Sequence, residues 1–420
     1  MRIAHVLRKY NPAEWGGTET AVQRLLDGLA RRQVSSVVFA PKSATTPPCD
    51  PLQAAGHEVK RFKAFVPVAR ISTAQKRQLI AVGGNLMSFD LIARLFGEPN
   101  LSLIHTHAIN RIGGIALTVA RARGLPLVAT IHGGVLDLPE TVRARLQKPL
   151  RGGWEWGKIF GPLLRSRHVL ATADAIIACN EKEAELARKK WPGKTVLTQP
   201  HGVWVQQYRE DCRETARRAF PELSGRKALL AIGRIDPVKN QLWLVQQMPA
   251  ILTAHPDTLL LLVGACTDEA YGKLLKKEIR NLGLDAQVLL TGGLPPDDRR
   301  LVGLLQEAVA LLLPSLSETF GLVILEAWAA GRPVLSTRTS GACSLIRDRE
   351  NGRVFDLADP REFHQALDEF FSCPAWASAL GQAGQRLVRA QYDTLVLADR
   401  IKHLYEGLIE GKHALRRPPR

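Results

Sequence analysis

Two basic residues five positions apart could bind a departing diphosphate. Arg234 and Lys239 lie in the segment Gly233–Lys239, directly after an apolar run of strand length. A guanidinium holds phosphate oxygens through two N–H groups, and an ammonium adds a point charge. On one strand-to-helix loop both can face the same anion, near the helix N-terminus. Taken alone, such a pair is more often a solvated surface loop.

A second candidate anion site lies in the segment Pro314–Pro333. A strand ends at Pro314, a polar turn carries Glu318, Gly321 opens an amphipathic helix, and Glu326 lies further along it. N–H groups at a helix start bind anions, and glycine lets a ligand approach the backbone closely. Two glutamates at this spacing also occur by chance. The specific evidence for a site is therefore the surrounding pattern of strand, turn and helix.

Histidines form the third group of candidate residues. His132 follows an apolar run, and His105 and His107 are alternate residues of another. Alternate strand residues share a face, so this pair could ligate a metal. A lone histidine at a strand end is usually structural, so His132 has both a structural and a functional interpretation.

Alternation of apolar runs with helix-length amphipathic segments predicts how these residues are positioned. Several runs are continuously apolar, which is typical of strands buried on both faces of a parallel sheet. Repeated strand–helix units build doubly wound sheets, whose ligands bind beyond the carboxyl ends of the strands. We expect strands at 2–7, 35–40, 102–107, 126–132, 175–179, 195–200, 228–233, 258–264, 287–291, 308–314 and 333–337, and helices at 18–31, 181–190, 240–254 and 320–330.

The pattern restarts once, after a charged stretch that follows residue 200. The 420 residues therefore suit two domains. We expect an N-terminal Rossmann-like domain over 1–204 and a C-terminal one over 205–390. A helix over 391–411 is expected to pack back toward the N-terminal domain, ahead of a basic tail at 412–420.

The whole chain resembles glycosyltransferase family 4, the retaining group 1 glycosyl transferases with the GT-B fold. The segment 314–333 resembles the donor-site signature of that family, and Arg234 and Lys239 match its diphosphate-binding pair. Further landmarks occur in the right order along the chain: Gly16-Gly17-Thr18-Glu19, His132-Gly133, Ala173–Ile177 before Asn180-Glu181, and Pro200–Val203. The resemblance implies an α/β fold in which two doubly wound parallel-sheet domains face each other across a cleft that holds the active site. It also implies that the N-terminal domain (1–204) binds the acceptor and the C-terminal domain (205–390) binds the nucleotide sugar.

The resemblance also implies a role for each matched residue. His132 and Glu318 are the expected catalytic residues, with His132 beside the transferring sugar. The donor sugar is expected on Glu318, Thr319 and Phe320, the ribose on Glu326, and the diphosphate on Gly16, Gly17, Arg234, Lys239, Gly321 and Leu322.

The implied reaction is retaining transfer of a hexosyl group from a UDP- or GDP-sugar to a hydroxyl acceptor, in polysaccharide, lipopolysaccharide or glycolipid synthesis. Arg234 and Lys239 would take the place of a divalent metal, and the sequence has no Asp-x-Asp triplet to hold one. We therefore expect no metal and no cofactor. The family pattern also argues against a metal at His105 and His107.

Charge is distributed unevenly along the chain, which has a formal net charge of +17. Residues 1–200 carry 29 Lys and Arg against 14 Asp and Glu, whereas residues 201–420 carry 28 against 26. A basic half suits an anionic membrane or a nucleic acid, and suits equally well a solvated surface that only aids solubility. With the resemblance, we expect an anionic membrane surface or a lipid-linked acceptor as partner, and no nucleic acid, whose motifs are missing.

The cysteines and apolar runs indicate where the protein acts. The six cysteines are widely spaced and form no C-x-x-C pair, and no run reaches the length of a membrane helix. We expect a cytoplasmic protein, peripheral on the cytoplasmic membrane face. A GT-B sugar-nucleotide epimerase and a non-catalytic nucleotide-sugar-binding protein remain alternatives. An oxidoreductase is disfavoured, since no G-x-G-x-x-G follows a strand.

Overall fold

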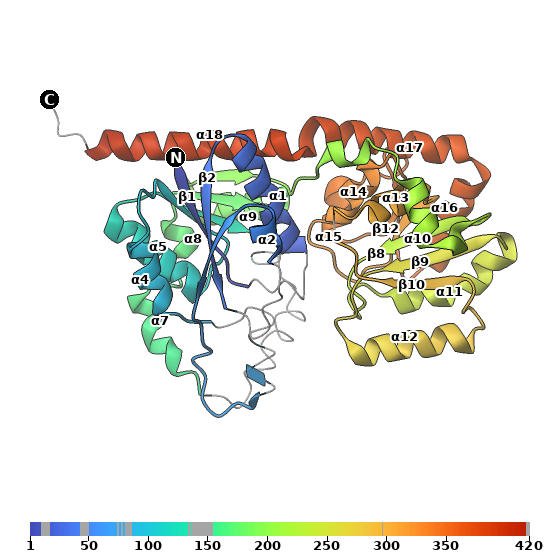
Figure 1. Cartoon of the computed structure of the whole chain (residues 1–420), viewed down its shortest axis with the longest axis horizontal. Coiled ribbons are helices and arrows are strands. Elements are labelled where there is room, and N and C mark those ends of the chain that lie inside the picture. The colour runs from blue at the N-terminus through green and yellow to red at the C-terminus, as the bar shows by residue number, and fades with distance from the viewer. Residues whose placement is uncertain are drawn as a thin grey trace. The chain divides into compact units, whose positions relative to one another are not determined.

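The computed structural model describes residues 1–9, 17–42, 50–73, 75–76, 79, 86–132, 136, 154–295 and 297–416. The chain forms two compact units, one of Met1–Pro200 with Leu397–Arg420 and the other of His201–Val396 (Figure 1). The division falls a few residues before the boundary expected after residue 204. Helix α18 (Thr394–Arg416) belongs to the first unit from Leu397 onward, and it continues past residue 411, where the sequence predicted a basic tail.

The first unit contains a seven-stranded sheet in which every neighbouring pair of strands is parallel. Its order is β3-β2-β1-β4-β5-β6-β7, so the chain moves outward in one direction from β1 and then in the other from β4. The strands are β1 (Arg2–Val6), β2 (Ser35–Pro41), β3 (Glu58–Phe62), β4 (Leu103–Thr106), β5 (Leu127–Ile131), β6 (Ala175–Ala178) and β7 (Thr195–Thr198).

Helices cover both faces of this sheet. Apolar residues of α4 and α5 pack on one face with Ala4 and Ile104, while α1 and α18 supply the cover of the other face, against Ile3 and Leu103. Alternate strand residues thus face different helices, as the pleat requires. Among the described residues of this unit the helices are α1 (Gly17–Arg31), α2 (Pro51–Ala54), α4 (Asp90–Phe96), α5 (Arg111–Arg123), α7 (Phe160–Leu163), α8 (Val169–Thr172), α9 (Glu181–Lys190) and α18.

The second unit contains a six-stranded parallel sheet with the order β10-β9-β8-β11-β12-β13. It has the same doubly wound plan, with the change of direction between β8 and β11. The strands are β8 (Lys227–Ile232), β9 (Thr258–Val263), β10 (Val288–Gly292), β11 (Ala310–Leu313), β12 (Val334–Thr337) and β13 (Arg353–Phe355). The helices are α10 (Arg213–Ala219), α11 (Gln241–Ala254), α12 (Glu269–Asn281), α13 (Arg299–Glu307), α14 (Leu322–Ala329), α15 (Ser340–Leu345), α16 (Pro360–Ser372) and α17 (Pro374–Leu387).

The expected fold class, two parallel-sheet Rossmann-like units, is confirmed. Each strand expected from the sequence is present to within a residue or two, but β3 and β13 were not predicted. Strand β3 lies at a sheet edge and is mostly polar, and β13 has only three residues, so neither shows a buried apolar run. Among the described helices none is both long and apolar enough to cross a bilayer.

Candidate functional site

The candidate donor residues of the second unit lie at the point where its sheet changes direction. Strands β8 and β11 are neighbours, yet the crossovers that leave them run to opposite sides. The loops after these two strands, 233–240 and 314–321, therefore meet beyond the same edge. In doubly wound sheets this crevice is where ligands bind.

Asp236 organises the loop after β8. Its buried carboxylate accepts hydrogen bonds from the backbone N–H groups of Val238 and Lys239, at 2.9 and 3.0 Å. It also pairs with the Arg234 guanidinium at 3.1 Å, and the Arg234 side chain is 49% exposed. A short polar side chain that closes a turn on its own backbone in this way holds the loop rigid. Arg234 and Lys239 are consequently presented by one fixed turn.

The loop after β11 joins the first loop through backbone and side chains. The Leu316 N–H donates to the Val238 carbonyl at 2.8 Å. The Lys239 ammonium forms an ion pair with the Glu318 carboxylate, and these side chains are only 19% and 16% exposed. The structure therefore places the expected diphosphate-binding cation against the expected sugar-binding carboxylate.

The turn from Glu318 to Gly321 is held from a third element. Near the start of α15, the Gly341 N–H donates to the Glu318 carbonyl at 2.8 Å, and a Cβ at Gly341 would lie 2.5 Å from the Phe320 nitrogen. Gly321 has a φ of +89°, a left-handed conformation that glycine adopts without strain. Helix α14 begins at the next residue, Leu322, so its first-turn N–H groups lie beside this turn.

Other expected donor residues lie on the same loop and helix. Thr319 lies in the turn, and Phe320 is buried with its ring edge-on to His201 at 5.0 Å between ring centroids. Glu326 is buried on the second turn of α14. Of the residues expected to close over the diphosphate from the first unit, Gly17 opens α1, and Gly16 lies outside the described residues.

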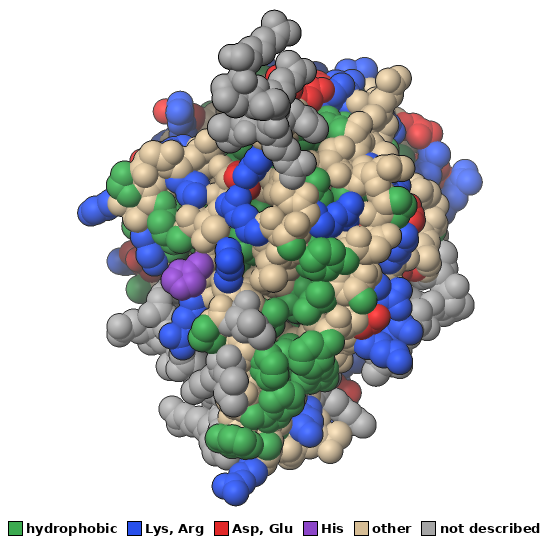
Figure 2. All heavy atoms as spheres, turned by 90° about the vertical axis from the view of Figure 1, so that its left-hand side faces the viewer, with side chains coloured by type: hydrophobic (Ala, Val, Ile, Leu, Met, Phe, Trp, Pro, Cys, Tyr) green, Lys and Arg blue, Asp and Glu red, His purple; other side chains and the backbone are tan. Residues whose placement is uncertain are grey.

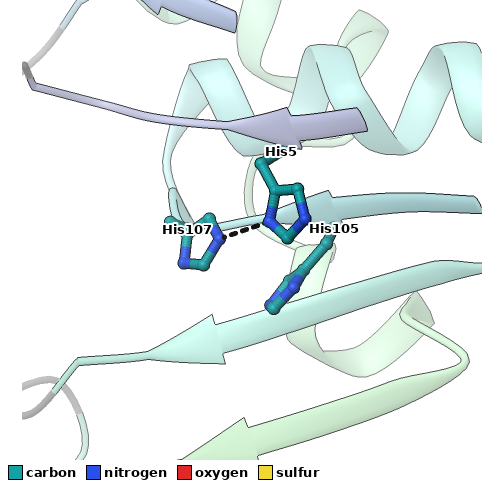
Figure 3. A group of neighbouring side chains, drawn as sticks. All are labelled: His5, His105 and His107. Carbon is teal, nitrogen blue, oxygen red and sulfur yellow. Dashed lines mark hydrogen bonds between the residues drawn. The ribbon is translucent and has the colours of Figure 1, made fainter. Parts of the chain in front are cut away.

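His132 directly follows β5 in the first unit, and it belongs to a group of four neighbouring histidines. Its Nε2 lies 2.8 Å from Nδ1 of His107, and Nε2 of His107 lies 3.2 Å from Nδ1 of His5. His105 lies beside His107, with ring centroids 4.2 Å apart and the rings tilted by 32°. Figure 3 shows His5 and His107 directed at each other, with His105 next to them.

Burial keeps the two innermost histidines of this cluster, His5 and His105, uncharged. Desolvation lowers the pKa of His5 to about 3, and the charge of His57 acts in the same direction. Desolvation, followed by the neighbouring histidines, holds the pKa of His105 well below its usual value. His105 uses its ring nitrogens on Tyr405 of α18 and on Thr130 of β5, each at 2.6 Å. Three imidazoles this close could hold a metal ion in principle, so the expectation of no metal stays a prediction.

Sequence analysis missed three residues that support the candidate site. Asp236 and Gly341 shape the loops that carry Arg234 and Glu318, and His5 completes the histidine cluster. Asp236 could have been found as a turn-forming residue between the two cations. His5 could not, because its partners become apparent only once β1 and β4 are known to be neighbours.

Two family models match the chain, one over each unit. The model described as glycosyl transferase 4-like domain matches residues 16–200, and the one described as glycosyl transferases group 1 matches residues 213–387. D-inositol 3-phosphate glycosyltransferase of Corynebacterium urealyticum is 31% identical over 93% of this chain and 90% of its own. The chain belongs to the group 1 glycosyltransferases of family 4.

One further relative and two solved structures match this glycosyltransferase over nearly its whole length. A GDP-mannose-dependent alpha-(1-6)-phosphatidylinositol monomannoside mannosyltransferase of Mycolicibacterium smegmatis is 23% identical over 96% of this chain and 98% of its own. The crystal structure of Anabaena HepE in complex with UDP-glucose matches with a TM-score of 0.73 at 17% identity, covering 97% of this chain and 100% of that one. Sucrose-phosphate synthase of Thermosynechococcus elongatus matches with a TM-score of 0.72 at 20% identity, covering 98% and 99%. At these identities the structures show the fold alone.

The buried histidines predict that the glycosyltransferase loses stability below about pH 6.5. The folded-state pKa of His5 is about 3, below its ordinary value of 6.5, so between these values the unfolded chain binds a proton that the folded chain does not. Stability falls as the pH falls through 6.5, by about 2 kcal/mol at about pH 5 for this residue. Urea unfolding of the wild type and of His5→Asn measures it: the pH dependence of the variant should be shallower. Identical pH dependence in the two proteins would contradict the buried, neutral state of His5.

Proposed function

We propose that this glycosyltransferase moves a sugar from a UDP- or GDP-sugar to a hydroxyl acceptor with retention of configuration, in polysaccharide, lipopolysaccharide or glycolipid synthesis. The observation that carries the proposal is the ion pair between Lys239 and Glu318, beside Arg234. A cation suited to a diphosphate and a carboxylate suited to sugar hydroxyls are adjacent at the change of direction of the second sheet. A nucleotide sugar has these two groups next to each other.

The chemistry follows from charge separation. As the glycosidic bond breaks, the anomeric carbon gains positive charge and the diphosphate gains negative charge. Arg234 and Lys239 stabilise the departing diphosphate, with the first-turn N–H groups of α14. Two fixed cations supply the charge that a divalent metal supplies elsewhere, so the proposed reaction is independent of metal. When a donor binds, Lys239 turns toward phosphate, and Glu318 accepts hydrogen bonds from sugar hydroxyls.

Retention requires that the acceptor enter on the face from which the diphosphate leaves. The leaving phosphate oxygen then takes the proton of the acceptor hydroxyl, and no side chain has to act as a base. Glu318 positions the sugar and does not attack it. Glu326 binds the ribose hydroxyls, and His132 hydrogen-bonds to the reacting sugar.

The relatives support an anionic acceptor. Their names specify inositol 3-phosphate and a phosphatidylinositol mannoside, which both carry phosphate. The first 200 residues of this chain carry 29 Lys and Arg against 14 Asp and Glu. An acceptor with a phosphate, free or lipid-linked, would be attracted to a domain of this charge.

A panel of nucleotide sugars tests the proposed reaction. We expect turnover with one UDP- or GDP-sugar and a phosphorylated acceptor, in buffer containing a metal chelator. Proton NMR of the first product should show the same anomeric configuration as the donor. Inversion would overturn retention, dependence on a divalent ion would overturn metal independence, and conversion of donor without acceptor would favour an epimerase.

Removing either Arg234 or Lys239 should abolish most activity without unfolding the protein. Arg234→Ala and Lys239→Ala each remove charge at the leaving diphosphate, and we expect kcat to fall by about 100-fold or more. Lys276→Ala, which removes an exposed lysine of α12, is the matched control. Steady-state kinetics with thermal unfolding measure both effects. Near-normal turnover in both variants would remove the diphosphate assignment.

The first unit also has a surface suited to a membrane. We define the aromatic patch as Phe65, Phe89, Trp154, Trp156 and Phe160. The rings of Phe65 and Phe89 are 5.9 Å apart, as are those of Phe65 and Trp156, and Phe89 lies 5.7 Å from Phe160. Phe89 is 52% and Trp154 64% exposed. Figure 2 shows hydrophobic side chains gathered on this side of the molecule, with Lys and Arg around them. Exposed aromatic rings with basic neighbours are typical of proteins that bind a bilayer surface.

Liposome sedimentation tests peripheral binding. We expect more protein on vesicles with anionic lipid than on neutral vesicles, and less as salt is raised. The double variant Phe89→Ser/Trp154→Ser should bind the vesicles at least about tenfold more weakly, because two rings can no longer enter the interface. Leu274→Ser, an exposed apolar residue of α12 in the second unit, should bind like the wild type. Equal partitioning between the two kinds of vesicle would end the membrane hypothesis.

A further inference from the structure

The histidine cluster occupies the change of direction of the first sheet, the position that the donor residues occupy in the second. His5 of β1 and His105 of β4 are register partners, and these strands leave toward opposite ends of the sheet. His107 and His132 follow β4 and β5 at the same edge. A sheet edge of this kind is where ligands bind, so polar groups here are candidates for function.

Three of the imidazoles form a linear series. Nε2 of His132 lies 2.8 Å from Nδ1 of His107, and Nε2 of His107 lies 3.2 Å from Nδ1 of His5. The series continues to the Ser36 hydroxyl, 3.4 Å from Nε2 of His5. His107 therefore uses one ring nitrogen toward His132 and the other toward His5. Figure 3 shows the contact between His107 and His5.

The protonation of such a series is constrained. A neutral imidazole has one N–H group and one lone pair, so it donates at one nitrogen and accepts at the other. If His107 donates to His132 through Nδ1, it must accept from His5 at Nε2, and the reverse holds in the opposite state. Because burial keeps His5 uncharged, the rings cannot relieve this constraint by taking up a proton there. The tautomers of the three rings are thus coupled.

His105 keeps His107 in this orientation. Its ring lies against that of His107 at 4.2 Å and 32°, and its own nitrogens are held by Tyr405 and Thr130. The same contacts argue against a metal ion, since an imidazole binds a metal through a nitrogen in its ring plane and both nitrogens of His105 are directed at hydroxyls. The nitrogens of His5 and His107 that face each other are likewise at hydrogen-bond distance.

We propose that His107 is a positioning residue which, backed by His5, fixes the tautomer and ring orientation of His132. This inference rests on the proposed function, because the sugar-binding task of His132 is taken from it. His132 then presents the same ring nitrogen, in the same protonation state, to each sugar that arrives. A second residue that fixes an active histidine in this way also acts in hydrolytic triads.

A pair of isosteric substitutions separates this role from a merely structural one. The amide of asparagine reaches the place of Nδ1, which faces His132, and the amide of glutamine reaches the place of Nε2, which faces His5. Both lose the ring that lies against His105. We expect His107→Asn to keep kcat within about threefold and His107→Gln to lower kcat by about tenfold or more, with similar KM for the donor. Equal kcat in the two variants, or the reverse order, would overturn the proposal.

A second measurement needs no turnover and so separates this inference from the proposed function. Nitrogen-15 NMR of histidine-labelled protein, at about pH 7.5, reads the tautomer of each ring directly. We expect one tautomer of His132 in the wild type and in His107→Asn, and a mixture in His107→Gln. A mixture in the wild type would overturn the proposal, even if the transferase is active. So would stoichiometric zinc bound through His5 and His107 in the purified protein, because their lone pairs would then be on the metal.

Discussion

Both candidate sites depend on one feature of the strand order. In each unit, the first strand lies beside a strand that comes much later in the chain. In parallel sheets all strands end at one edge, and helical crossovers on both sides leave a gap only where the winding changes direction. Here that gap lies between β1 and β4 in the first unit and between β8 and β11 in the second. The winding order thus decides which loops border the gap, and the candidate residues lie on those loops.

The two gaps are filled with different electrostatics. In the second unit, two cations and a carboxylate remain partly exposed, so a charged ligand can reach them and take the place of a partner. In the first unit, three of the four imidazoles are buried, and burial drives the two deepest, His5 and His105, to the neutral form. A charged diphosphate suits the former environment. Sugar hydroxyls, which both donate and accept, suit the latter.

Sequence reasoning reached what is encoded locally and missed what depends on pairing across the chain. Arg234, Lys239 and Glu318 were identified because their loops follow buried apolar strands, and the structure brings them together. Strand β3 was missed because a polar edge strand has no apolar run. The link between His5 and His107 was missed for a different reason: it depends on the order of strands that are about a hundred residues apart in sequence.

The end of the chain takes part in the same arrangement. Tyr405 of α18 is fully buried against the first sheet, and its hydroxyl lies 2.6 Å from Nδ1 of His105. Arg32 and Asp399 join the helix to the unit through two further contacts, at 2.6 and 2.7 Å. A leucine or phenylalanine at position 405 would fill the space, but only a hydroxyl satisfies the buried imidazole. The orientation of His105, and through it that of His107, therefore depends on a residue 300 positions away, so the first unit's site is complete only when the last helix has docked.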